Sequence, residues 1–562
     1  MRQTASGTSG TFRVLAAVAV AALVVAGCGD DDDDTPGLSE PADIGAAVEE
    51  APATDADSEP DAAAPDDEPE AADAVTPDDE PEAADAGSGP VRGGELRVFR
   101  GIFHEGWDPD AALELGSIQY IQHVMEPLIR ANPDGLTLDP GIAESWDYDH
   151  EGLTFTVNIN PNAKFSDGTP VTAEDVAFSA EEWKAGPNYG ILYASLAEAE
   201  IVDDHTVIFS MEYPDSSLDA ILTWQSAAVM PKDFGGRSRD EYMANPIGAG
   251  PFAVESWQPG AELVLVRNEH FYDSERPYLD RIVITENSDR NQRMVAFESG
   301  ASDLVLVPPD QISSIPSHQL TLAPAHLMHY LGFNTTAAPF DEADVRRALA
   351  LAIDYDAIVS LGSGTWETAT GGIPPNIADW APPSAPYLRR DLDQARQLLE
   401  AAGATGLSVE LIFDTGIVNH DLVAQVIQSS LGDAGVDVEI VALDTNSHIE
   451  RIGSGEYDLD LWTMVAISPT AIDPVGYYSA VDYLYTGYPL DVIFDVLVEF
   501  TETVDDAEQA AAITKVQDEI ATEVPFVALA NQQTAFAASQ RVNGFAPAPW
   551  ATWWYDRIWL SG

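Results

Sequence analysis

Residues 164–179 read Lys-Phe-Ser-Asp-Gly-Thr-Pro-Val-Thr-Ala-Glu-Asp-Val-Ala-Phe-Ser, and they predict a sharp turn followed by a helix. Gly168 suits a positive φ, and Pro170 holds the residue before it in an extended conformation, so the first half of the stretch is a turn. Residues 172–175 have the composition and spacing of a capping box, which predicts a helix from there through Trp183.

Strands and helices alternate outward from this stretch. Residues 95–100 are rich in β-formers, and residues 153–159 alternate apolar and polar side chains as a half-buried strand does. Strand 407–413, helix 421–433 and strand 436–443 predict a right-handed βαβ unit. A further strand is expected at 457–465. The pattern predicts a large α/β protein.

Two further helices begin at predicted caps. Asp341 is expected to open a helix that ends at Ile353. Asp391 is expected to open a second helix that runs through Ala402, with Gly403 as the residue after its C-cap.

Composition excludes several classes of protein. The 562 residues hold 25 Lys+Arg and 95 Asp+Glu, for a formal charge of −70, and one cysteine. Binding to a nucleic-acid backbone needs basic patches, which this chain does not supply, so we expect no nucleic-acid partner. One cysteine excludes a disulfide framework and a four-cysteine zinc site.

The acidic charge is concentrated before the α/β part. Residues 29–90 hold 23 Asp+Glu, no Lys or Arg, and a ten-residue duplication at 65–74 and 77–86. Low hydrophobicity and high net charge cannot offset the entropy of ordering, so residues 29–93 are predicted to be a disordered acidic linker.

The first 28 residues have the pattern of a leader. Arg2 and Arg13 precede an unbroken run of 13 apolar residues at 14–26, which is too short to cross a membrane but suits a signal peptide. The run ends Ala26-Gly27-Cys28, which resembles a bacterial lipobox. The resemblance implies that Cys28 is acylated and that the mature protein is a lipoprotein on the outer face of the cytoplasmic membrane.

A series of motifs is similar to the peptide/nickel family, family 5, of extracellular solute-binding proteins, the receptors of ATP-binding-cassette (ABC) importers. Order and spacing agree over nearly all of residues 94–555. The matching segments are 141–146, 154–157, 164–179, 245–252, 267–268, 277–280, 299–303, 332–335, 345–349, 352–354, 373–375, 395–403, 473–474 and 523–526.

The resemblance implies a two-lobed, three-domain periplasmic-binding-protein fold in which a solute is captured by lobe closure about a hinge. By analogy, domain I gathers 94–129, 222–329 and 534–562, domain II is 130–221, and domain III is 330–533. It also implies permease and ATPase subunits as partners, and we expect the protein itself to be a monomer.

The solute-binding residues are expected by the same analogy. Peptide-binding relatives place a carboxylate shortly before an Asp-Pro to bind the α-ammonium; here Thr470 takes that place. Dipeptide binders place an arginine in the loop corresponding to 414–420, which has none here. Losing both anchors weakens the case for short free peptides, because an unpaired buried ammonium is costly. The expected solute-binding residues are Trp107, Asp108, Tyr120, Trp366, Trp462, Thr470, Asp473 and Tyr477.

Other functions stay open at this point. The solute is expected to be a peptide or peptide-like compound, and the alternatives are an oligosaccharide, chelated nickel, another small polar compound, or a sensing or chaperone role without transport. No Gly-x-Ser-x-Gly, Walker A or His-Glu-x-x-His motif is present, and His326 and His329 point to opposite faces of a predicted strand. We therefore expect no enzymatic activity, no cofactor and no metal site.

Overall fold

The structure is a computed structural model, and it describes residues 89–101, 104–112, 115–132, 137–374, 381–465, 486–488, 491–548 and 553–562. The leader, with Cys28, and almost all of the predicted acidic linker lie outside these ranges. Three of the expected solute-binding residues, Thr470, Asp473 and Tyr477, also lie outside them.

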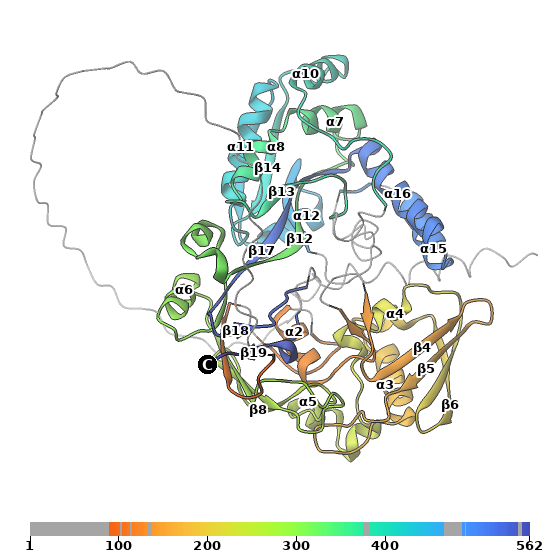
Figure 1. Cartoon of the computed structure of the whole chain (residues 1–562). Helices are drawn as coiled ribbons and strands as arrows, with labels where there is room; N and C mark the ends of the chain where they lie inside the picture. Colours follow the sequence, from red (N-terminus) through yellow and green to blue (C-terminus); the bar gives the residue numbers. More distant parts are fainter. Residues whose placement is uncertain are drawn as a thin grey trace, which may run out of the picture. The chain divides into compact units, whose positions relative to one another are not determined.

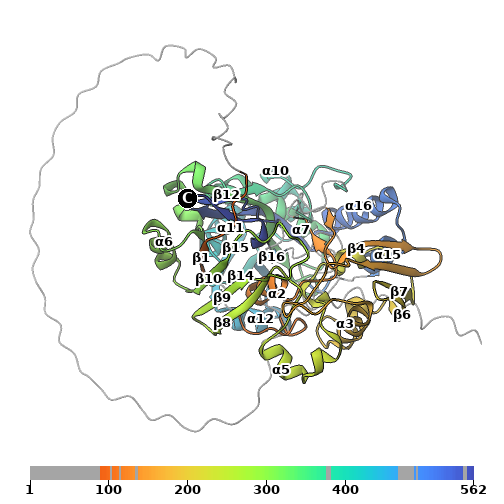
Figure 2. The same ribbon diagram turned by 60° about the horizontal axis from the view of Figure 1, so that its bottom comes forward.

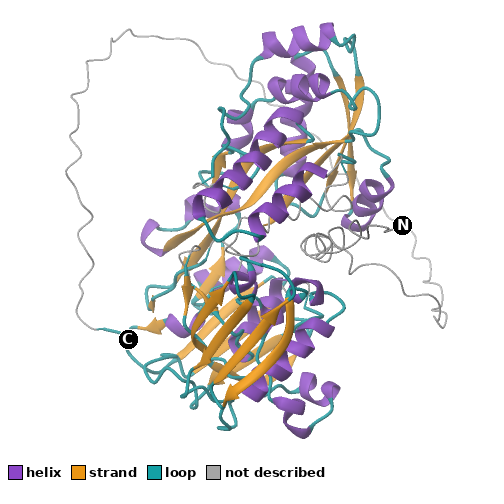
Figure 3. Ribbon diagram, turned by 90° about the vertical axis from the view of Figure 1, so that its right-hand side faces the viewer, coloured by secondary structure: helices purple, strands orange, loops and turns teal. Residues whose placement is uncertain are grey.

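A large mixed sheet organises the part of the chain that the structure describes. Its strands lie in the order β15-β14-β16-β12-β17-β11-β1-β10-β9-β8, and β13 pairs with the middle of β17. Helices lie along the faces of the strands, as the colouring in Figure 3 shows. The bounds are β1 (Glu95–Arg100), β8 (Phe252–Gln258), β9 (Glu262–Arg267), β10 (Arg281–Glu286), β11 (Leu304–Leu306), β12 (Leu320–Phe333), β13 (Trp366–Thr368), β14 (Ser408–Asp414), β15 (Asp437–Leu443), β16 (Leu459–Val465) and β17 (Phe526–Ala538).

The predicted βαβ unit is confirmed. β14 and β15 pair in parallel, from Ser408 opposite Asp437 to Asp414 opposite Leu443. Helix α11 (His420–Asp433) connects them and buries Val423, Ile427 and Leu431, which follow one another at four-residue intervals and so lie on one face. That face packs in the hydrophobic core that also contains residues of β14 and β15.

The turn and capping box of residues 164–179 are confirmed. Gly168 has a φ of +90°, and helix α3 (Ala173–Ala185) begins where the Thr172 N–H donates to the Asp175 carboxylate at 2.8 Å. The helix packs on an antiparallel sheet of β4 (Ala143–Asp149), β5 (Thr154–Ile159), β7 (Thr206–Met211) and β6 (Leu196–Asp203), in that order. The four-residue helix α4 (Leu218–Ile221) follows β7 in the chain.

Two strands connect the hydrophobic cores. β12 and β17 lie antiparallel and side by side (Figure 1), with Gly332 opposite Phe526 at one end and Leu320 opposite Ala537 at the other. The first end belongs to the core of β14, β16 and α11, and the second end adjoins a core beneath β11. The chain therefore passes twice between these cores along paired strands.

The strands β1, β10, β9 and β8 follow one another in the view of Figure 2. A separate core lies beneath them and includes residues of α2 (Leu115–Val124) and of the segment 553–558. The other helices that the structure describes are α5 (Arg239–Ala244), α6 (Arg290–Glu298), α7 (Ala343–Ala352), α8 (Tyr355–Ser360), α10 (Leu392–Ala401), α12 (Thr445–Ser454), α15 (Asp491–Thr501) and α16 (Asp506–Glu523). The short strand pairs are β2 (Arg130–Ala131) with β3 (Leu138–Asp139), and β18 (Val542–Asn543) with β19 (Trp559–Leu560).

One predicted cap is wrong and one is confirmed. Helix α7 begins at Ala343 after Glu342, and Asp341 belongs to the preceding turn, in which its N–H bonds the Ala337 carbonyl at 3.1 Å. Asp391 caps α10 as expected and accepts from the Gln394 N–H at 2.9 Å.

Candidate functional site

The middle of β17 is the part of that strand that is least buried. Residues 526–531 and 535–537 are buried, whereas Gln532, Gln533 and Thr534 between them are half-buried. These three residues lie at the boundary between the two cores that β12 and β17 connect. The middle of β17 is therefore closer to the protein surface than the buried stretches on either side of it.

The carboxyl ends of strands from both halves of the large sheet point toward this place. β16 runs in the same direction as β17 and ends at Val465, at the level of Gln532. β1 runs in the opposite direction, and Phe99 near its end is at the level of Ala537. In open α/β sheets ligands bind outside the carboxyl ends of strands, so the two sets of ends mark the candidate site.

Two charged residues stand at the carboxyl ends of β1 and β10. Arg100 and Glu286 are the last residues of these parallel strands and lie opposite each other in register. Each is 6% exposed. The Glu286 carboxylate accepts from the His104 N–H at 2.8 Å, and burial raises the pKa of Glu286.

Two of the expected aromatic residues meet around His104. The His104 ring lies 4.2 Å from the Trp107 ring and 5.8 Å from the Tyr120 ring, in edge-on geometry. Trp257 of β8 contacts His104 from a third side at 4.6 Å. Burial lowers the pKa of His104 to about 3, so the imidazole is neutral at physiological pH.

Asp108 is engaged elsewhere. Its carboxylate oxygens accept from the Arg239 guanidinium at 2.6 and 2.9 Å, an ion pair that is open to solvent. Trp107 therefore lies in the core, whereas the next residue, Asp108, points toward α5.

The other set of strand ends carries a buried histidine pair. His329 Nδ1 of β12 lies 3.1 Å from His420 Nε2, at the start of α11, and the Thr463 hydroxyl of β16 lies within 3.1 Å of both atoms. His329 Nε2 contacts the Gln532 amide oxygen at 2.7 Å. With that oxygen as acceptor, His329 Nε2 carries the proton and Nδ1 accepts.

Burial keeps this pair neutral. Burial lowers the pKa of His329 to about 4, and it lowers the pKa of His420 well below the usual value. A positive charge on the imidazole of His329 or of His448 would lower the pKa of His420 further. Trp366, another expected site residue, lies over the His329 ring at 4.2 Å and is itself buried. The structure thus brings Trp366 to the histidine pair.

Trp462 lies on the same strand as Thr463, one residue earlier. Its indole is half-buried and stacks on the His448 imidazole at 4.2 Å with an interplanar angle of 8°. His448 in turn contacts the Asp460 carboxylate at 2.7 Å. Trp462 is thereby held in one orientation near the end of β16.

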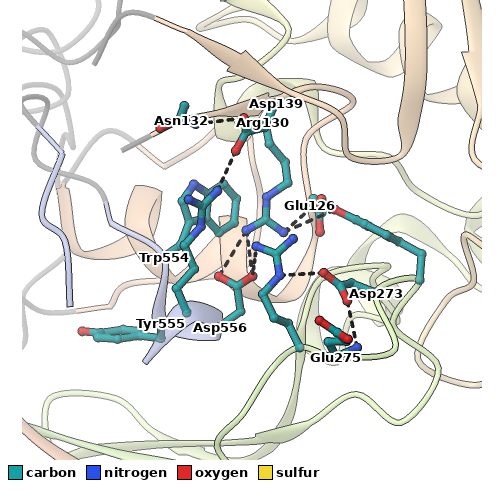
Figure 4. A network of polar contacts seen from close by, with 12 residues as sticks. Glu126, Arg130, Asn132, Asp139, Asp273, Glu275, Trp554, Tyr555 and Asp556 are labelled. Carbon is teal, nitrogen blue, oxygen red and sulfur yellow. Dashed lines mark hydrogen bonds and ion pairs between the residues drawn. The ribbon is translucent and has the colours of Figure 1, made fainter. Parts of the chain in front are cut away.

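A buried ion-pair network holds the segment 554–556 against β2 and against Glu126, two residues after the end of α2 (Figure 4). Arg130 donates two hydrogen bonds to Asp556, at 3.1 and 3.2 Å, lies 3.5 Å from Glu126 and stacks 3.8 Å above the Trp554 ring. Burial raises the pKa of Glu126 to about 7 despite the opposing effect of Arg130. The network fixes Trp553 and Tyr555 close to Arg100.

Several residues of this site were not singled out from the sequence. Arg100 and Glu286 are the terminal charged residues of two alternating strands, a local signal that could have identified them. The pair of His329 and His420 had no such signal, because the two residues are 91 positions apart.

The residues that the structure describes contain no group of three or more His, Cys, Asp or Glu side chains placed to hold a metal ion. They also contain no helix that is both long enough and apolar enough to cross a membrane.

The sequence model for bacterial extracellular solute-binding proteins, family 5 (middle region), matches residues 137–483, which is more than half of the chain. The chain belongs to this family. The resemblance found in the sequence is confirmed, and the family is one of extracytoplasmic solute-binding proteins, not of enzymes. The matched region extends from β3 to the residues after β16.

A curated relative of this family 5 protein is the probable D,D-dipeptide-binding periplasmic protein DdpA of Escherichia coli K12. The two are 26% identical over 430 residues, which cover 73% of this chain and 82% of the relative.

Solved structures share the fold. The oligopeptide-binding protein AppA of Bacillus subtilis, in complex with a nonapeptide, matches with a TM-score of 0.68 at 22% identity over 84% of this chain and 100% of that one. AgaA of A. tumefaciens R10, in complex with agropinic acid, gives 0.68 at 23% identity over 84% and 99%. The predicted two-lobed α/β fold is confirmed.

Proposed function

We propose that this family 5 protein captures a peptide-like solute between the two sets of strand ends and delivers it to the permease and ATPase subunits of an ABC importer. The observation that carries the proposal is the meeting of the carboxyl ends of β1 and β16 at the half-buried middle of β17. Strand ends that belong to two cores can enclose a solute when the cores move together.

The paired strands β12 and β17 serve as the hinge in this proposal, and domains I and III, with the predicted boundaries, are the lobes on either side. The register of the pair shifts between Ala323 and Leu327 and again between His329 and Tyr330. Such irregularities interrupt ladder hydrogen bonds and let strands bend. Asn334, just after β12, bonds the Gly455 and Tyr457 carbonyls and secures the strand to domain III.

The proposed solute-lining residues are those expected from the sequence. Tyr120, Trp107, Trp366 and Trp462 surround the strand ends, and the last of them is half-buried. Thr470, Asp473 and Tyr477 follow the end of β16 in the chain and are proposed for the same reason. Asp108 would have to leave Arg239 to contact a solute.

A peptide-like solute is favoured by the named ligands of similar proteins. DdpA is described as a D,D-dipeptide-binding protein, and AppA holds a nonapeptide. A second candidate is a non-peptide organic acid, because AgaA, which shares the fold, holds agropinic acid. The two candidates share carboxylate groups and differ in the peptide bond.

Native mass spectrometry of protein purified without refolding tests the choice. A retained mass that fragments into amino acids supports the first candidate, and a retained non-peptide acid supports the second. A library of free peptides that produces no shift in melting temperature would contradict the peptide proposal, since any bound ligand stabilises the native state by mass action.

We also propose that acylated Cys28 anchors the protein to the outer face of the membrane and that residues 29–93 are the tether. Two or more acyl chains are needed for stable anchoring. Cys28→Ala should release the mature protein from membranes washed at high salt. Retention of this variant in the washed membrane fraction would exclude the anchor.

A further inference from the structure

Within the part of the chain that the structure describes, Arg100 is buried without an anionic partner. Its side chain lies over the Trp553 ring, 4.5 Å from the centroid, and one of its terminal nitrogens, Nη1, makes no hydrogen bond. No carboxylate of the described residues lies within ion-pair distance of it, whereas buried Arg130 pairs with both Asp556 and Glu126. A buried guanidinium without a counter-ion is costly, and an anionic ligand that paired with Arg100 would offset that cost.

Glu286 is the matching half of this arrangement. It lies opposite Arg100 in register, yet the two side chains do not form an ion pair in the part of the chain that is described. One carboxylate oxygen, Oε1, accepts from the backbone N–H of His104, and the other, Oε2, has no donor within hydrogen-bond distance. The backbone of Gly260 also acts on this carboxylate and lowers its pKa against the larger effect of burial. The site therefore presents one free donor group and one free acceptor group on neighbouring strands.

Two further side chains beside this pair also have free polar atoms. Neither ring nitrogen of His104 makes a hydrogen bond, nor does the Tyr120 hydroxyl, and both residues are at least 99% buried. The His104 backbone N–H donates to Glu286, and the Tyr120 ring lies 5.8 Å from the His104 ring, so these groups are close together. Buried polar groups are normally paired, and a cluster of unpaired ones at strand ends needs an explanation.

We propose that Arg100 and Glu286 form an anchor on domain I for a solute that carries both a carboxylate and an N–H donor. The carboxylate would bind the Arg100 guanidinium, and the N–H would bind the free Glu286 oxygen. This inference rests on the proposed function and narrows it to amino-acid-derived acids, including peptides with a free carboxyl end. It also explains how a charged solute is held although domain III lacks an arginine in residues 414–420.

The anchor is chemically balanced. One guanidinium and one carboxylate of the protein face one carboxylate and one N–H of the solute, so each buried charge gains a partner on binding. Charge-assisted hydrogen bonds of this kind are about twice as strong as neutral ones. A neutral oligosaccharide offers no group that would pair with Arg100.

The test uses the full-length chain and compounds in matched pairs. Melting temperature and calorimetric affinity are measured with a panel of di- to pentapeptides, their C-terminal amides, non-peptide organic acids with their amides, and neutral oligosaccharides. The variants are Arg100→Gln and Glu286→Gln. The control variants are Arg290→Gln and Glu298→Gln, which are exposed at the two ends of α6.

We expect the wild-type protein and both controls to bind free acids at least tenfold more tightly than the amides. Arg100→Gln should lose that preference, and Glu286→Gln should bind the free acids at least tenfold more weakly than wild type. Without solute, Arg100→Gln should melt at the same temperature as wild type or higher, because the substitution removes an unpaired buried charge. A purely structural arginine would instead lower the melting temperature.

The failures of the two proposals are distinguishable. If peptides bind and Arg100→Gln keeps the preference for free acids, the anchor is wrong and the proposed function stands. If only non-peptide acids bind and their binding depends on Arg100, the anchor stands and the peptide function is wrong. Binding of neutral solutes alone, or of nothing in the panel, overturns both.

Discussion

Asp556 accepts two hydrogen bonds from the guanidinium of Arg130, which lies 426 positions earlier in the chain. Both side chains are at most 1% exposed. The pair joins the C-terminal segment to β2, and the same segment carries Trp553 and Tyr555 beside Arg100. Segments that are distant in the sequence thus share one buried charge pair near the candidate site.

Breaking this pair is expected to be strongly destabilising. Asp556→Asn leaves Arg130 with Glu126 at 3.5 Å as its remaining carboxylate contact, and loss of one partner of a buried pair typically costs about 3–5 kcal/mol. Urea unfolding measures the loss. The matched control is Asp139→Asn, which removes the partner of Arg557 in a pair whose side chains are each 29% exposed and should cost about 0–1 kcal/mol. If Asp556→Asn and Asp139→Asn lost the same unfolding free energy, the buried pair of Arg130 and Asp556 would not be a major source of stability.

Stability should fall as the pH drops below about 6.5, the unperturbed histidine pKa. The folded-state pKa of His329 is lowered to about 4 by burial, so between these values the unfolded chain binds a proton that the folded chain does not. The unfolding free energy contributed by this residue is therefore complete above pH 6.5, and it decreases by at most about 1.4 kcal/mol per pH unit as the pH falls.

The variant His329→Gln isolates this contribution. Its unfolding free energy should depend less steeply on pH between 6.5 and 4 than that of the wild type. Glu126, whose raised pKa acts in the opposite direction, contributes equally to both proteins and cancels. His205 is exposed, so His205→Gln should keep the wild-type slope. Identical slopes for His329→Gln and wild type would show that the buried imidazole does not control the pH dependence.

Local features of the fold could be predicted from the sequence because their causes are local. The turn at Gly168, the box formed by Thr172 and Asp175, and the cap at Asp391 depend on residues within a few positions of one another. The exception is Asp341, which belongs to a turn that begins at Ala337, so the helix begins two residues later.

The site could be predicted only in part. The sequence predicts that Trp107, Tyr120 and Trp366 line the solute site; the structure places the first two beside His104 and the third over His329, and their contact with a solute stays a prediction. The polar residues beside them are not predicted, since Arg100 and Glu286 become neighbours only through the pairing of two strands, and they are 186 positions apart in the chain. Likewise, the sequence offers only His326, on the same strand, as a neighbour of His329, whereas its partner in the structure, His420, comes from a helix.

The cap of α10 offers a third measurement. Asp391→Ala removes the acceptor of the Gln394 N–H and should cost about 0.5–2 kcal/mol of unfolding free energy. Asp393→Ala, two residues later and 91% exposed, is the matched control and should change the unfolding free energy by no more than about 0.5 kcal/mol. A control as damaging as the cap variant would mean that charge near the helix start, not the cap bond, supplies the stability.

Gly248 positions the helix that carries Gln119 and Tyr120. A Cβ added at Gly248 would lie 1.8 Å from the Val124 carbonyl oxygen at the end of α2, so Gly248→Ala must displace the helix or the loop. Overpacking of this kind typically costs about 1–3 kcal/mol. Because α2 carries Tyr120, which lies beside the proposed anchor, solute affinity should fall as well, measured by calorimetry at a temperature where the variant is fully folded. The control Gly432→Ala has open space around its Cβ in α11 and should be neutral or stabilising by about 0.5–1 kcal/mol. If the folded Gly248→Ala variant bound solute with unchanged affinity, solute binding would not depend on the position of α2.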